Sequence, residues 1–78
     1  MNSFFKERYC IAVYSLAGEY LDHRRRSTKQ DAIKCANDWL LDSFNKFGES
    51  GKMYAIVYND LIPNDKGIKI TIESHWNI

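Results

Sequence analysis

The residues with the clearest chemical potential are basic and lie close together in the sequence. They run from the end of a predicted strand into the start of a predicted helix, and comprise Arg24, Arg25, Arg26, Lys29 and Lys34. Cations beside the free N–H groups and positive dipole end of a helix N-terminus suit a phosphate or a carboxylate. Charges on an edge strand also prevent aggregation, which is a plainer interpretation. This basic patch therefore predicts contact with nucleic acid or an acidic protein surface, or a protected edge.

Aromatic residues form the second group of candidates. The chain has five tyrosines, four phenylalanines and two tryptophans, which is more aromatic surface than one helix can cover. Exposed tyrosines can anchor a protein interface or stack on bases, whereas buried ones simply pack in a thin core. The glycine-flanked aromatic run of sheet-surface RNA-binding domains is absent. The aromatic anchors that we predict are Tyr14, Tyr20 and Tyr58, with Tyr54 and Trp76 as further residues for an open face or edge.

Residues suited to catalysis are scattered. Cys10, His23 and His75 have no companions at metal-ligand spacing, and no glycine-rich phosphate loop, HExxH, GxSxG or CxxC motif is present. Cys10 and Cys35 lie among apolar neighbours, where buried, reduced thiols are expected. A chain of 78 residues also has little volume for an enclosed pocket. The sequence thus predicts a non-enzymatic protein with no catalytic residue, metal site or cofactor.

Acidic residues recur on the outward side of the predicted helix. Asp31, Asp38 and Asp42 align in one stripe that is interrupted by Lys34. Pairing of Lys34 with Asp31 and Asp38 on a solvated face explains the stripe. The alternative is that the stripe meets a basic groove on a partner, as a mimic of a nucleic-acid backbone would.

Alternating apolar residues predict the strands that position these groups. Residues 8–15 and 52–58 are apolar on both faces, and Ile68, Ile70 and Ile72 alternate with polar residues in the last strand. Residues 19–25 can return as the partner of the first strand after a turn at Gly18, and residues 63–67 are dense in turn formers. The chain therefore contains two predicted β-hairpins.

Between the hairpins the apolar spacing is helical. Ile33, Ala36, Leu40, Phe44 and Phe47 recur at steps of three and four residues. Ser27 and Thr28 are both suited to cap the helix, and Ser27 and Gln30 fit the spacing of a capping box. Gly48 is suited to end the helix.

The sequence therefore predicts an α+β fold in β-β-α-β-β order, with one amphipathic helix on one face of a four-stranded antiparallel sheet. We expect residues 1–78 to form a single domain that is monomeric or homodimeric. The formal net charge of +1 creates no field toward nucleic acid, and no apolar run reaches the roughly 20 residues that span a membrane. We expect no membrane contact and a cytoplasmic location.

The layout resembles that of small phage-encoded inhibitor proteins, including some anti-CRISPR proteins. The resemblance rests on a hairpin that ends in a polar turn, a helix start with Ser27, Thr28, Asp31 and Ala32, and a second hairpin. The first half also resembles the strand-strand-helix unit of the antitoxin HicB and of small integrase-attached DNA-binding domains, without their third strand. The resemblance implies a binding protein that blocks a host protein or ribonucleoprotein complex. The alternatives are a nucleic-acid-binding protein that uses Arg24 to Lys34, and a structural homodimer.

Overall fold

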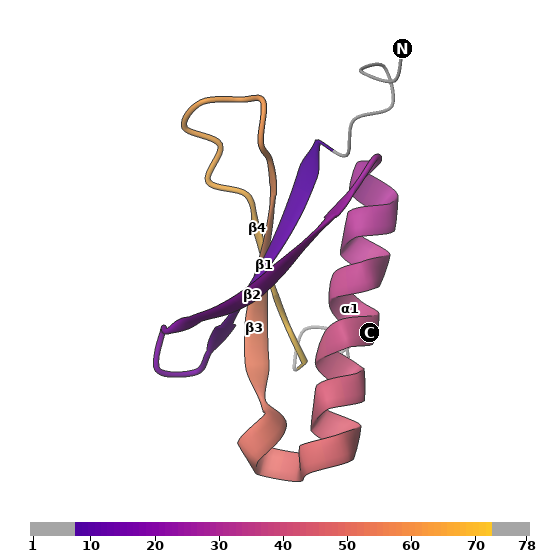
Figure 1. The fold of residues 1–78 in the computed structure, drawn as a ribbon, viewed down its shortest axis with the longest axis vertical. Coiled ribbons are helices and arrows are strands. Elements are labelled where there is room, and N and C mark those ends of the chain that lie inside the picture. The colour runs from indigo at the N-terminus through magenta and orange to yellow at the C-terminus, as the bar shows by residue number, and fades with distance from the viewer. Residues whose placement is uncertain (1–7, 73–78) are drawn as a thin grey trace.

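A single long helix lies along one face of a four-stranded antiparallel sheet (Figure 1), which confirms the predicted α+β fold and element order. The computed structural model describes residues 8–72, so His75 and Trp76 lie outside the described residues. The strands lie in the spatial order β2-β1-β3-β4. The elements are β1 (Tyr9–Ser15), β2 (Tyr20–Arg26), α1 (Lys29–Phe47), the short 3-10 helix η2 (Gly48–Gly51), β3 (Met53–Asn59) and β4 (Ile68–Thr71).

The hydrophobic core lies between the helix and the central strands. Ala32, Ala36 and Leu40 of α1 are at most 1% exposed. They pack against aliphatic side chains of β1, β3 and β4 and the residue after β4, namely Ile11, Val13, Ala55, Val57, Ile70 and Ile72. Because two of the three buried helix residues are alanines, the helix backbone can approach the sheet closely. The predicted burial of the alternating isoleucines holds for Ile70 and Ile72, whereas Ile68 is 38% exposed.

The helix is capped by the second of the two residues that the sequence offers as caps. Thr28, and not Ser27, is the N-cap, and its side-chain oxygen accepts a hydrogen bond of 3.1 Å from the Asp31 N–H. The prediction of a Ser27–Gln30 capping box is therefore wrong. Thr28 has extended backbone angles, and the cap satisfies one of the free N–H groups of the first turn. At the other end Gly48 closes the helix with a φ of 62°, as its position predicts.

The connection from the helix to β3 is tight. Ser43 Oγ donates a hydrogen bond of 2.8 Å to the Gly51 carbonyl oxygen, and Gly51 is buried. A Cβ atom at this position would overlap the Ser43 carbonyl oxygen and the Phe47 Cβ. The link Glu49-Ser50-Gly51 is therefore an ordered turn that joins α1 closely to β3.

The helix does not cover all of the sheet. Figure 1 shows that β2 diverges from the helix axis, so that the turn of the first hairpin is far from the C-terminal end of α1. Val13 lies opposite Asp22 but Tyr14 lies opposite Tyr20, so Leu21 is an extra, unpaired residue of β2. This β-bulge bends the first hairpin. Within the described part of the chain, no helix is long and apolar enough to cross a membrane.

Candidate functional site

The three consecutive arginines do not form one continuous patch. Side chains alternate between the two faces along a strand, so Arg24 and Arg26 lie on the helix side of β2 and Arg25 lies on the opposite face. The pairing of β2 with β1 agrees, since Arg24 lies opposite buried Ile11 and Arg25 opposite Cys10. The sheet therefore divides the predicted basic patch between two surfaces.

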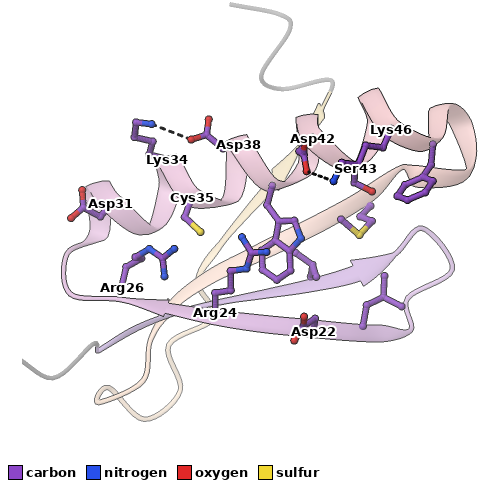
Figure 2. Close-up of a pocket in the computed structure, with 15 residues that line it drawn as sticks. Asp22, Arg24, Arg26, Asp31, Lys34, Cys35, Asp38, Asp42, Ser43 and Lys46 are labelled. Carbon is purple, nitrogen blue, oxygen red and sulfur yellow. Dashed lines mark hydrogen bonds and ion pairs between the residues drawn. The ribbon is translucent and has the colours of Figure 1, made fainter.

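The first surface is an open groove of about 930 Å³ between β2 and α1. Figure 2 shows Arg24 and Arg26 extending from β2 toward the helix, with Cys35 above them. The Arg24 guanidinium lies 3.9 Å from the centre of the Trp39 ring. In this contact the Arg24 side chain covers one side of the Trp39 indole. Arg24 therefore packs against the helix as well as carrying a positive charge into the groove.

Charges along the groove balance one another. Lys34 pairs with Asp38 at 3.0 Å and Lys46 with Asp42 at 3.6 Å. The predicted Lys34–Asp38 pair is thus present, whereas the structure gives no Lys34–Asp31 pair among the described residues. The residues that line the groove include four basic ones (Arg24, Arg26, Lys34 and Lys46) and four acidic ones (Asp22, Asp31, Asp38 and Asp42). Such a lining does not concentrate positive charge for a phosphate backbone.

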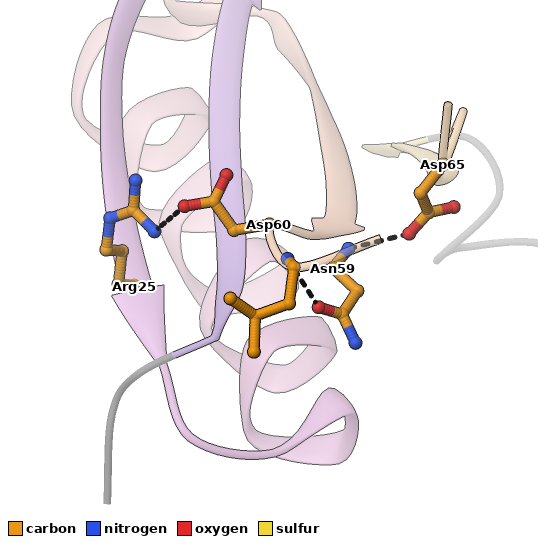
Figure 3. Close-up of polar contacts among 5 residues, drawn as sticks. Arg25, Asn59, Asp60 and Asp65 are labelled. Carbon is orange, nitrogen blue, oxygen red and sulfur yellow. Dashed lines mark hydrogen bonds and ion pairs between the residues drawn. The ribbon is translucent and has the colours of Figure 1, made fainter. Parts of the chain in front are cut away.

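Arg25 instead lies on the face of the sheet opposite α1. We call this the uncovered face, because α1 does not lie on it. It forms an ion pair with Asp60, which follows β3 (Figure 3), and this contact raises the pKa of Arg25. On the same face Tyr58 lies beside Cys10 in the sheet register. A hydrogen bond with the Cys10 thiol, together with burial, raises the pKa of Tyr58 to about 12. Arg25 and Tyr58, both predicted site residues, thus lie close to each other around Cys10.

Both cysteines are free thiols, as the sequence predicts. Cys10 is buried, but Cys35 is only partly so. Among residues 8–72, no three histidine, cysteine or acidic side chains lie together where they could hold a metal ion.

Lys29 lies near the loop between β3 and β4. It lines a small hollow of about 290 Å³ with Ile62, Asp65 and other residues of this loop. The Asp65 carboxylate accepts hydrogen bonds from the Asn59 N–H at 2.7 Å and the Gly67 N–H at 3.0 Å, the first of which Figure 3 shows. These two bonds, with a smaller contribution from the charge of Lys29, lower the pKa of Asp65. Lys29 thus lies beside this loop and not in the groove with Arg24 and Arg26.

The second surface is a line of aromatic rings on the uncovered face. Tyr14 and Tyr54 lie directly opposite each other on β1 and β3, and their rings stack with centres 5.3 Å apart. Tyr20 of β2 meets Tyr14 edge-to-face at 6.0 Å, and the Lys69 ammonium lies 4.5 Å from the centre of the Tyr54 ring. We call Tyr20, Tyr14, Tyr54 and Lys69 the tyrosine row, which contains one residue from each strand.

A histidine extends the tyrosine row at its outer end. The Tyr20 hydroxyl lies 2.6 Å from His23 Nδ1. Tyr20 itself is 55% exposed, whereas Tyr14 and Tyr54 are half-buried. The tyrosine row therefore has a fixed middle and an accessible end on β2.

The predicted anchors Tyr14 and Tyr20 are in contact, but Tyr58 lies farther along the same face, opposite Cys10. Lys69 and His23 were not predicted as members of the site. The signal for Lys69 was its position between Ile68 and Ile70, because strand alternation places it on the face away from the core. Contact with Tyr54 also needs the register of β3 with β4, which the sequence pattern does not specify.

Comparison with protein-family models, with curated proteins and with solved structures finds no match to this chain. The function must therefore be argued from the two surfaces themselves.

Proposed function

We propose that this chain is a non-enzymatic binding protein that docks on another protein through the tyrosine row. The observation that carries the proposal is a line of three tyrosines on a sheet face that the helix leaves uncovered. Tyrosine is among the residues that contribute most binding energy at interfaces, because it buries a large rigid ring and keeps a hydroxyl for hydrogen bonding. Tyr20, with its exposed ring and His23 beside it, is the proposed anchor.

The arrangement of the rings favours a protein over single-stranded nucleic acid. Proteins that bind single strands leave aromatic ring faces free, and bases stack on them. Here the Tyr54 ring lies between the Tyr14 ring and the Lys69 ammonium, and Tyr14 lies between Tyr54 and Tyr20. The middle of the row therefore offers ring edges and hydroxyls, which suit a folded protein surface. The division of the arginines between two faces also weakens the case for direct nucleic-acid binding through residues 24–34.

We infer further that the bound protein is inhibited by this contact. A small domain that presents one aromatic face can act by covering the working surface of its partner. The layout that resembles phage-encoded inhibitors, including anti-CRISPR proteins, adds to this proposal. The expected partner is a host protein or ribonucleoprotein complex, and the expected place of action is the cytoplasm.

The test is capture of partners from host lysate by the tagged protein and by two matched variants. Tyr20→Ala removes the proposed anchor, whereas Phe47→Ala removes another exposed aromatic ring, at the end of α1 and outside the row. Proteins that wild type and Phe47→Ala recover, with nuclease present, and that Tyr20→Ala loses would support the proposal. Equal recovery by all three would refute the docking surface. Recovery that nuclease abolishes would shift the function to nucleic-acid binding.

A further inference from the structure

The two edges of the sheet differ in how much backbone they leave unpaired. β4 is only four residues long, whereas β2 has seven residues and pairs only with β1. The first five residues of β2 are exposed. An exposed edge strand offers N–H and C=O groups to any strand that aligns with it. The edge of β2 is thus the larger unpartnered backbone surface of the described chain.

Two hydrogen bonds show which backbone groups of β2 point away from β1. The His23 N–H donates to the Asp22 carboxylate at 2.7 Å, and the Arg25 carbonyl oxygen accepts from the Arg26 guanidinium at 2.6 Å. Backbone groups alternate in direction along an antiparallel strand, so residues 23 and 25 present their groups outward while 22, 24 and 26 face β1.

We propose that β2 pairs with β2 of a second copy of this chain, antiparallel, with the two-fold axis at His23. A two-fold axis requires that the same residues meet from both sides. The outward-pointing residues must form the hydrogen-bonded pairs, because only they have free N–H and C=O groups. His23 opposite His23 of the second copy meets both conditions. The two sheets then form one continuous sheet of eight strands.

Charge selects this register from its neighbours. With His23 on the axis, Asp22 lies opposite Arg24 of the second copy, and Arg24 lies opposite Asp22 of the second copy. Asp22 and Arg24 would thus form non-hydrogen-bonded pairs, the kind of cross-strand pair in which opposite side chains lie closest together. An axis at Asp22 would place two carboxylates together, and an axis at Arg24 would place two guanidiniums together. An axis at Arg25 would set Arg24 against Arg26. Opposite charges across strands stabilise pairing and like charges oppose it.

In this dimer, backbone groups at the free edge of β2 can exchange their present side-chain partners for backbone partners on the second copy. The His23 N–H leaves the Asp22 carboxylate and donates to the His23 carbonyl of the second copy, which frees Asp22 to meet Arg24 of the second copy. The His23 N–H and the Asp22 carboxylate, which lose each other as partners, therefore each gain a new one. The dimer also places the exposed ends of two tyrosine rows beside the axis, but its formation does not depend on whether those rows bind a partner.

Sedimentation across micromolar to millimolar concentrations tests the proposal, since wild type should approach twice its monomer mass of 9.2 kDa. Asp22→Arg and Arg24→Asp should each remain monomeric, because each creates like-charge pairs across the axis. When the two variants are mixed, both cross-strand pairs join Arg to Asp, so an equimolar mixture should form a heterodimer. Dimerisation only on mixing is the decisive expected result.

His23→Pro provides a variant that does not depend on charge. Its N–H points away from β1, so proline removes no bond of the β1–β2 ladder but blocks pairing with a second copy. It should remain monomeric with an unchanged circular dichroism spectrum. A wild-type protein that stays monomeric at every concentration would overturn the proposal. So would a dimer that survives both His23→Pro and the single charge reversals, because it would use another surface.

Discussion

The two faces of the sheet are built on different principles, although the same strands form both. Over the central strands β1 and β3 the helix-side face carries buried aliphatic residues such as Ile11 and Val13, which are at most 1% exposed. The uncovered face carries the tyrosine row, in which each ring contacts another ring or a charged or polar side chain. This aliphatic part of the first face is excluded from water and needs only shape and hydrophobicity. The second keeps polar groups at its surface, and it is the face that we propose docks on a partner.

This difference separates stability from the proposed recognition within one thin domain. Burial of an aliphatic side chain contributes about 1.5–3 kcal/mol through the hydrophobic effect. A cross-strand aromatic or ionic pair at a half-exposed position contributes about 0.2–1 kcal/mol. Changes on the helix-side face should therefore alter the fold, whereas changes in the tyrosine row should alter binding more than stability.

The largest expected effect is on the helix-side face. Leu40→Ala should lower the free energy of unfolding by about 2–5 kcal/mol, because it leaves a cavity in the centre of the core. Urea denaturation followed by circular dichroism measures this loss. Tyr20→Ala, the matched change on the other face, should lower it by less than about 1 kcal/mol. Equal losses for both variants would show that the faces do not divide their roles in this way.

A smaller effect is expected at the cap that fixes where the helix begins over the core. Thr28→Ala should lower the free energy of unfolding by about 1 kcal/mol, because the Asp31 N–H loses its acceptor. Ser27→Ala should change it by less than about 0.5 kcal/mol, since Ser27 is not the cap. Thermal unfolding of both variants provides the measurement. The reverse order of stability would place the cap at Ser27.

The cation at the end of the tyrosine row gives a smaller effect still. Lys69→Ala should cost about 0.5 kcal/mol, the magnitude of an exposed cation–π contact. Lys66→Ala removes an exposed lysine of the neighbouring loop and should leave stability unchanged. Urea midpoints of the two variants compare them directly. A loss that is the same for both would indicate a general effect of charge rather than the ring contact.

Alkaline pH should weaken the uncovered face selectively. The pKa of Tyr58 is raised from 10.0 to about 12 in the folded chain, so folding favours the protonated phenol. Its contribution to stability is complete below pH 10.0 and is lost as the pH rises toward about 12. Tyr58→Phe should therefore show a smaller fall in urea midpoint over this range than wild type does. Ultraviolet absorbance of tyrosinate should show one late-titrating tyrosine in wild type that the variant lacks.

The sequence by itself determined the elements and their order. Apolar residues at steps of three and four place α1 on the sheet whatever the details of packing, and strict alternation in Ile68, Ile70 and Ile72 fixes the core side of the last strand. Local rules were less reliable where two residues compete for one role. Ser27 and Thr28 both suit a helix cap, and it is the Thr28 side chain that accepts the Asp31 N–H in the structure.

Only the tertiary structure decided which side chains act together. Arg24, Arg25 and Arg26 are adjacent in the chain, but strand alternation separates Arg25 from the other two, and the divergence of β2 from α1 leaves a groove between them. Tyr20, Tyr14, Tyr54 and Lys69 are distant in the chain and become neighbours through strand order and register. The register of each strand pair depends on how all four strands align with one another, and no short segment of sequence encodes that alignment. For this reason the tyrosine row could be recognised only in the folded structure.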